Sequence, residues 1–124
     1  MKTRRFRELL VWQQSMALAR EVYEITKAFP RSEMFGLTSQ LRRAAISVPS
    51  NIAAGHGRLS DKNFAVFLGQ ARGSLFEVET QLELAASLGY LQLEKLPTLL
   101  SQCEKITRMM NALVRMLRAE HSTK

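Results

Sequence analysis

The stretch from residue 37 to residue 58 constrains the fold of this chain most, because it combines a helical repeat with an internal proline. Its apolar residues recur at the spacing of one helix face and keep their phase on both sides of Pro49. They are Leu37, Leu41, Ala45, Val48 and Ile52. Proline removes a backbone donor and clashes with the carbonyl four residues earlier. The pattern therefore favours one helix kinked near Pro49, and the alternative is two short helices that break at Val48.

Three further segments have apolar residues at helical spacing, over about 7–29, 61–88 and 93–120. Pro30 ends the first segment, Gly55 and Gly57 are suited to end the kinked helix, and Gly89 is suited to end the third segment. No segment alternates apolar and polar residues as a strand does. Four long helices with short connections predict an all-α fold, an antiparallel up-down-up-down four-helix bundle.

The length of 124 residues predicts a single domain over residues 1–124, with a mobile basic arm at 1–6 and a mobile tail at 121–124. No apolar run approaches the roughly 20 residues of a membrane span, and the basic N-terminus lacks the apolar core of a signal peptide. Cys103 is the single cysteine, which excludes an internal disulfide. We therefore expect a cytoplasmic protein that does not enter a membrane.

The net charge is +7, from 18 lysines and arginines against 11 acidic residues. The basic residues gather in 1–20, 31–62 and 101–124, while 63–100 is mildly acidic. Such an excess favours contact with a polyanion, of which nucleic acid is the commonest in cells. It is equally typical of basic proteins that bind no nucleic acid.

No catalytic constellation is visible in the sequence. His56 and His121 belong to no metal-ligand pair, and no Cys-x-x-Cys motif suggests zinc. Ser47 and Ser50 have no histidine at a spacing that suggests a general base. The sequence therefore predicts a protein that is not an enzyme and has no catalytic residues, bound metal or cofactor.

Small and polar residues on the second and third helices are candidates for an interface, within the bundle or between subunits. A glycine inside a helix costs about 1 kcal/mol relative to alanine, so the close approach of another helix would explain Gly73. We further expect Asn51, Glu77 and Thr80 to make polar contacts. The candidate interface residues are Ser47, Ser50, Asn51, Gly73, Ser74, Glu77 and Thr80.

The basic residues around the second helix are candidates for contact with phosphate groups. They are Arg42, Arg43, Arg58 and Lys62, with Arg4 and Arg5 on the N-terminal arm. Such contacts would be sequence-tolerant and sensitive to salt. The alternative for Arg42 and Arg43 is a salt bridge between subunits, to Glu33, Glu77 or Glu79. No aromatic platform for stacked bases is visible, so we expect little reading of base identity.

Several of these motifs also occur together in a known family. They are Val11-Trp12-Gln13, Phe29-Pro30, Phe35 to Gln40, Leu41 to Ala45, Pro49 to Ala53, Gly55, Arg58, Gly73-Ser74-Leu75 and Leu88-Gly89-Tyr90. In these motifs the chain resembles the four-helix-bundle proteins encoded within intervening sequences of bacterial 23S rRNA genes. It departs from them at Ala54, where the family usually has glutamate.

The resemblance implies a helical bundle that assembles as a homopentamer. It also implies kinship with the accessory proteins of diversity-generating retroelements, which are basic pentamers that associate with nucleic acid and a reverse transcriptase. We therefore expect a non-enzymatic homo-oligomer that binds structured RNA or DNA. The alternative is a structural or adaptor oligomer whose partner is another protein.

Overall fold

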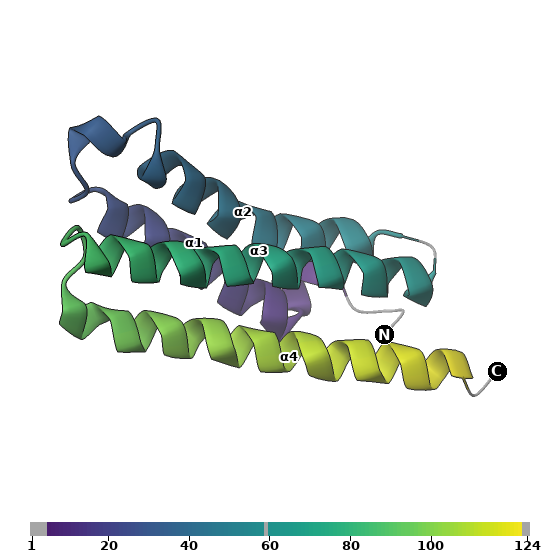
Figure 1. The fold of residues 1–124 in the computed structure, drawn as a ribbon. Helices are drawn as coiled ribbons and strands as arrows, with labels where there is room; N and C mark the ends of the chain where they lie inside the picture. The colour runs from purple at the N-terminus through teal and green to yellow at the C-terminus, as the bar shows by residue number, and fades with distance from the viewer. Residues whose placement is uncertain (1–4, 59, 123–124) are drawn as a thin grey trace.

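The computed structural model describes residues 5–58 and 60–122, with side chains to residue 120, and its long elements are four helices (Figure 1). They are α1 (Leu10–Thr26), α2 (Leu37–His56), α3 (Asp61–Ser87) and α4 (Leu96–Ser122). Three short 3₁₀ turns accompany them, Phe6–Glu8, Arg31–Glu33 and Leu93–Lys95. These described residues contain no strand, so the predicted all-α class is confirmed.

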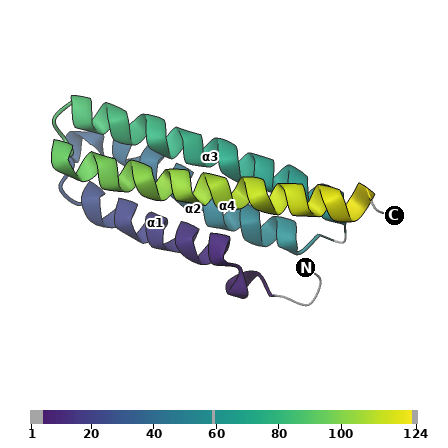
Figure 2. The same cartoon turned by 90° about the horizontal axis from the view of Figure 1, so that it is seen from below.

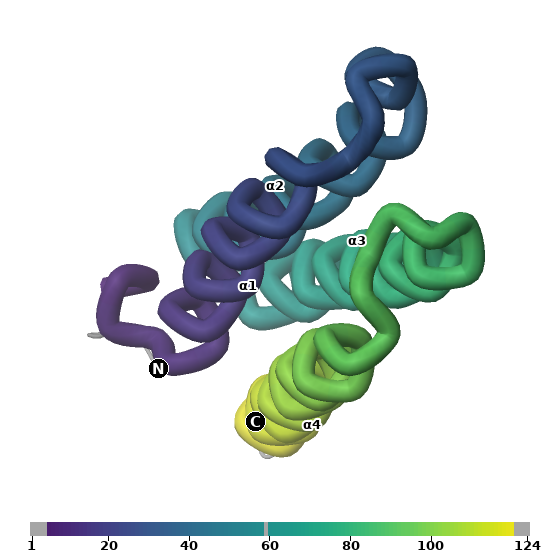
Figure 3. Tube along the Cα trace, turned by 90° about the vertical axis from the view of Figure 1, so that its left-hand side faces the viewer, coloured from purple at the N-terminus to yellow at the C-terminus, as the bar shows by residue number. Residues whose placement is uncertain are grey.

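The four helices pack into one bundle, which confirms the predicted four-helix architecture. Figure 1 shows the α1/α2 and α3/α4 connections at one end and the α2/α3 connection at the other. Figure 2 shows α4 lying along α3, and Figure 3 shows the four helices grouped about a common centre. The most extensive contact is between α2 and α3, and α1 with α4 is the least extensive of the four helix pairs that pack against each other substantially. None of the described helices combines the length and the apolar character that a membrane span requires.

The core is built from the predicted apolar rows of all four helices. Leu18, Leu41, Leu75 and Ile106 are examples, each with almost no exposed surface. The sequence of the α1 segment contains two apolar rows at helical spacing, one from Leu9 to Tyr23 and one of Val11, Leu18, Val22, Ile25 and Phe29. Every member of the second row is buried. The other row ends at Tyr23, whose side chain is 39% exposed. Burying each large aliphatic side chain contributes roughly 1.5–3 kcal/mol, so this core is the main source of stability.

Helix α1 is three residues shorter at each end than the predicted range of 7–29. At the start, Phe6–Glu8 forms a 3₁₀ turn and Leu9 is extended. At the end, the N–H groups of residues 27–29 donate to carbonyls three residues earlier, which tightens the last turn beyond Thr26. The prediction was wrong there because apolar spacing does not distinguish an α-helical turn from a 3₁₀ turn.

Helix α2 continues through Pro49 to His56, so the alternative of two short helices is wrong. The bend near Pro49 stays a prediction. Gly55 is not the end of the helix but a buried contact point. A Cβ atom on Gly55 would lie 2.5 Å from the Cβ of Phe67 and 3.0 Å from Cδ1 of Phe64. Glycine is therefore required there because α3 approaches α2 closely.

Candidate nucleic-acid interface

Arg42 joins α2 to α1 within its own chain. Its Nε donates a 2.8 Å hydrogen bond to Oγ1 of Thr26, and its guanidinium lies 4.6 Å from the centre of the Tyr23 ring. The Thr26 hydroxyl itself donates to the carbonyl of Val22 at 2.8 Å. The Arg42 side chain is half-buried in this arrangement. Its geometry is that of a packing contact between two helices.

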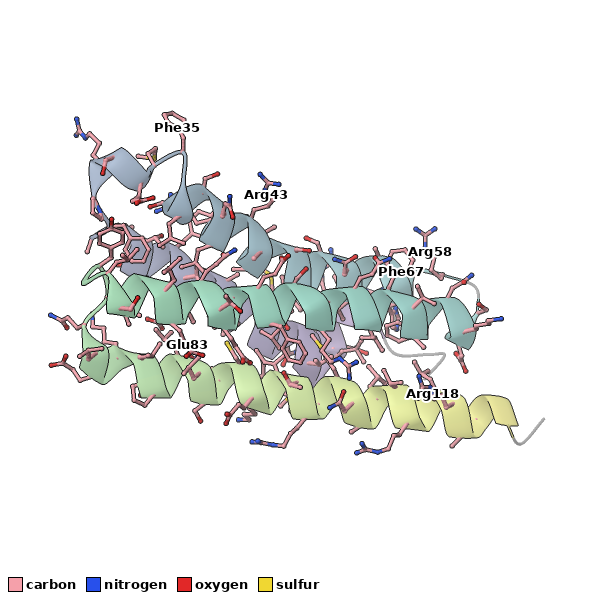
Figure 4. All side chains as sticks on the ribbon, in the orientation of Figure 1. Phe35, Arg43, Arg58, Phe67, Glu83 and Arg118 are labelled. Carbon is pink, nitrogen blue, oxygen red and sulfur yellow. The ribbon has the colours of Figure 1, made fainter. Side chains whose placement is uncertain are left out.

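Arg43, the next residue, is exposed and points away from the bundle in Figure 4. The described side chains form one ion pair with each other, Lys27 with Glu24 at 3.1 Å, so Arg43 has no carboxylate partner among them. Glu33, one of the predicted partners, instead accepts hydrogen bonds from the backbone N–H of Leu37 and the hydroxyl of Tyr90. Arg43 therefore forms no ion pair with any other described side chain.

The remaining predicted cations lie apart from Arg43. The Arg58 guanidinium is 4.7 Å from the centre of the Phe67 ring, near the α2/α3 connection (Figure 4). Lys62 is exposed in the first turn of α3, and Arg5 is exposed beside the 3₁₀ turn that precedes α1. Arg4 lies outside the described residues. The structure therefore does not gather these side chains into one site.

Three of the candidate interface residues form one polar link between α2 and α3. The hydroxyls of Ser47 and Ser74 are 2.8 Å apart, and the Asn51 amide donates to the Ser47 hydroxyl and carbonyl, both at 2.9 Å. The other four candidates, Ser50, Gly73, Glu77 and Thr80, are exposed. The Thr80 hydroxyl donates to the carbonyl of Phe76 on its own helix.

Gly73 is not explained by packing inside this chain. A Cβ atom at this position would meet no atom within 4 Å. The predicted close approach of a neighbouring helix is therefore absent within the described bundle. What remains of that prediction is a contact between subunits.

Three carboxylates, Glu79, Glu83 and Glu104, lie near Cys103 at the α3/α4 contact, and these described side chains do not form a reactive centre. Burial, followed by the charges of Glu104 and Glu83, raises the pKa of Glu79. Burial, followed by the charges of Glu79 and Glu104, raises the pKa of the Cys103 thiol to about 12. Such a thiol is protonated and unreactive near neutral pH. The described residues hold no group of three or more side chains able to bind a metal ion.

A basic groove follows the α3/α4 contact where α3 begins. It consists of two adjoining hollows of about 260 and 440 Å³ that share Ala65 and Arg118. Its cationic side chains are Lys62 and Arg72 from α3 and Arg115 and Arg118 from α4. Figure 4 shows Arg118 between the two helices. We call these four residues and the surface between them the α3/α4 basic groove.

The geometry of this groove is set by one hydrogen bond between its walls. The Arg72 guanidinium donates to the Asn111 side-chain oxygen at 2.9 Å. Leu68, Met110 and Val114 form its apolar floor, and among the described residues that line it Asp61 is the one carboxylate. Gly69 lies at its rim, where an added Cβ atom would meet nothing within 4 Å.

Sequence reasoning found Lys62 but missed the other three cations of the groove. Arg115 and Arg118 have a local explanation, since basic residues late in a helix interact favourably with its dipole. Arg72 is one of only two basic residues, with Lys95, in the mildly acidic stretch 63–100. The available signal was the short connection over residues 88–95, because residues at equal distances from the two ends of such a connection between two helices lie near each other.

Comparison with known proteins identifies relatives of the fold. The family described as 23S rRNA-intervening sequence protein matches residues 7–112. A crystal structure of a protein with unknown function, from the S23 ribosomal protein family of Bacteroides thetaiotaomicron VPI-5482, is similar with a TM-score of 0.78. That similarity covers 86% of this chain and 96% of the other at 20% sequence identity. The comparison with curated proteins gives no match. Neither description names an enzymatic activity.

Proposed function

The chain belongs to the 23S rRNA-intervening sequence protein family, and from this premise we propose a non-enzymatic homo-oligomer that binds RNA or DNA. The observation that carries the proposal is uncompensated positive charge. The net charge is +7, and the described side chains form a single ion pair with each other. Most of the described cationic side chains thus have no carboxylate partner and can contact phosphate groups, which is the sequence-independent part of nucleic-acid binding.

Self-assembly is the second part of the proposal, with a homopentamer as the expected state. Val66, Phe76 and Leu84 are 53%, 47% and 47% exposed on α3. At 3.6 residues per turn, these positions share the outward face of α3 with Gly73 and Thr80. Large exposed apolar side chains beside small residues support a contact with another subunit. Assembly repeats each basic surface, so weak phosphate contacts add up.

The implied kinship with the accessory proteins of diversity-generating retroelements belongs to this proposal, because it too predicts a basic pentamer. We also propose the cytoplasm as its compartment. The buried, unpaired Cys103 supports a reducing environment.

A filter-binding titration tests the proposed function. Protein of known oligomeric mass is titrated with structured RNA, single-stranded RNA and duplex DNA over a range of salt concentrations. We expect binding whose logarithm falls linearly with the logarithm of the salt concentration. The absence of binding to every probe at low salt would contradict the proposal.

Light scattering on two variants tests the assembly surface. Replacing Phe76 and Leu84 by glutamate places charges on the outward face of α3, so we expect a smaller mass and an unchanged helical spectrum. The matched control is Leu93→Glu, since Leu93 is 69% exposed in the turn before α4. An unchanged mass in the α3 variant would contradict this surface.

An adaptor for another protein is the second candidate function. Phe35 is 95% exposed beside Met34, which is 49% exposed, and Figure 4 shows Phe35 pointing away from the bundle. An apolar side chain presented in this way suits a protein partner better than a phosphate backbone. A protein partner that stays bound to the wild type at high salt, and that Phe35→Ser does not bind, would favour this function over nucleic-acid binding.

A further inference from the structure

The α3/α4 basic groove differs from the other basic surface of this chain because its cations converge. Two helices contribute two cations each, Lys62 and Arg72 from α3 and Arg115 and Arg118 from α4. Asp61 is the single carboxylate in the part of the lining that the structure describes. None of the four cations forms an ion pair with another described side chain. Converging cations without anionic partners favour an external anion.

The arrangement suits phosphate groups in particular. Arginine presents a planar set of donors that matches the oxygens of a phosphate. Arg72 is already held in place by its hydrogen bond to Asn111, which leaves other N–H groups available for a ligand. Its orientation therefore requires little ordering when an anion binds.

The dimensions of the groove indicate a strand rather than a single phosphate. Lys62 and Arg72 are ten residues apart on one helix, which corresponds to roughly 15 Å. The described lining contains no aromatic side chain for stacking, and its one neutral polar side chain, Asn111, already accepts a hydrogen bond from Arg72. Such a surface contacts the sugar–phosphate backbone and leaves base identity unread.

We infer that the α3/α4 basic groove binds successive phosphates of one nucleic-acid strand, with Arg72, Arg115 and Arg118 as its main contacts. This inference rests on the proposed nucleic-acid-binding function and assigns the site for it. Gly69 supports the assignment, because the missing side chain leaves the rim open between Arg72 and the floor.

Charge removal with a matched control tests the site. The groove variant combines Arg115→Gln with Arg118→Gln. The control combines Arg20→Gln with Lys105→Gln, which changes the net charge equally but lies in other hollows of the surface. The probes are one single-stranded RNA and the DNA of the same sequence, each titrated over a range of salt concentrations, with inorganic phosphate as a competitor.

We expect the groove variant to bind single-stranded RNA about tenfold or more weakly, because charge-assisted contacts are lost. The slope of log K against log salt should shrink by about 1.4, or 0.7 for each phosphate contact removed. The control should retain most of its affinity. Equal losses of affinity in the two variants would contradict the groove as the binding site and leave the proposed function standing. A wild-type protein that binds neither probe would contradict both the binding site and the proposed function. Similar effects with RNA and DNA would show backbone recognition, and an effect confined to RNA would assign the 2′-hydroxyl a part.

A second variant tests the shape of the groove without changing its charge. Gly69→Leu places a bulky side chain at the rim, and Gln70→Leu, an exposed neighbour outside the groove lining, is the control. Leucine is a better helix former than glycine, so Gly69→Leu should unfold at the same temperature or higher. Weaker RNA binding in Gly69→Leu alone is the expected result. Unchanged binding in this variant would contradict a ligand seated between the two helices.

Discussion

The Tyr90 hydroxyl donates a 3.1 Å hydrogen bond to Oε2 of Glu33, while Oε1 of Glu33 accepts the backbone N–H of Leu37 at 2.9 Å. One carboxylate therefore joins the α1/α2 connection, the first turn of α2 and the α3/α4 connection. The hydrogen bond to Glu33, followed by burial and the charge of Glu33, raises the pKa of Tyr90. The neutral phenol is thus the form that fits the folded chain.

We predict that Glu33→Ala lowers the free energy of unfolding by about 1–2 kcal/mol, since α2 loses the acceptor for its first turn. Tyr90→Phe should lower it as well, and the double variant should lose less than the sum, because both changes remove one shared bond. Urea denaturation measures all three. Glu94→Ala, an exposed acidic residue before α4, is the control, and additive losses would contradict the shared bond.

Substitutions of Arg42 and Arg43 should differ in their effect on stability, because only Arg42 makes contacts between helices within the described chain. Arg42→Gln removes the hydrogen bond to Thr26 and the contact with Tyr23, so we expect a loss of about 1–2 kcal/mol in stability. Arg43→Gln should stay within about 0.5 kcal/mol of the wild type, because its side chain is exposed and forms no ion pair with the other described side chains. Thermal unfolding at one protein concentration checks both. A larger loss in Arg43→Gln would point to a partner subunit.

Two glycines should respond in opposite directions to the same change. In Gly55→Ala the new methyl group collides with Phe67 and Phe64, so we expect a loss of about 1–3 kcal/mol. In Gly73→Ala the methyl group meets open space, so the better helix former should stabilise the chain by up to about 1 kcal/mol. Urea denaturation of each variant beside the wild type measures both changes. Destabilisation by Gly73→Ala would contradict the open space on this face.

Glu79 should make stability depend on pH in a defined direction. Its pKa in the folded chain is raised above the ordinary 4.5, so its protonated form favours folding. That stabilisation is complete below the ordinary pKa and disappears as pH rises through the folded pKa. Glu79→Gln should therefore add roughly 0.2–0.5 kcal/mol at pH 7, the range for like charges four residues apart on a helix, and add nothing below about pH 4.

Urea titrations of Glu79→Gln and wild type from pH 3 to pH 8 measure this difference. The control is Glu21→Gln, an exposed acidic residue on α1. An equal gain at every pH would show that the carboxylate charge of Glu79 is not the cause.

Cys103 should behave as a reporter of unfolding. Its thiol is fully buried and its pKa is raised to about 12, so almost no thiolate exists at pH 8. We expect a disulfide reagent to label the native protein at the rate of unfolding and the urea-unfolded protein within seconds to minutes. Rapid labelling of the native protein at pH 8 would show that the α3/α4 contact opens locally.

Periodicity was sufficient for the fold because every helix buries one continuous apolar face. The rows through Leu41 and Leu75 identified α2 and α3, and the tight turn at Gly89 has the positive φ that favours glycine. Spacing did not reveal which cations share a surface. Arg72 and Arg115 are separated by 43 positions in the sequence and line one groove only because α4 lies along α3.

Arg42 is a second residue whose contacts could not be predicted from the spacing of residues within one helix. Its sequence neighbourhood is basic and suggests a phosphate contact, but its side chain reaches across to Thr26 and Tyr23 on α1. Whether a charged residue on a helix stays in solvent or packs against a neighbour depends on which side chains the next helix places opposite it. That information lies in the register between helices, which the spacing within one helix does not contain.

The unequal helix lengths have a consequence for local opening. Helix α1 has 17 residues and α4 has 27, so α4 continues well beyond the part of the bundle that α1 covers (Figure 2). Backbone amides in the last turns of α4 should exchange with deuterium faster than those near Cys103, since fewer neighbours protect them. A strand that bridges Arg118 and Lys62 would slow this exchange, so occupancy of the groove would be read directly from amide protection.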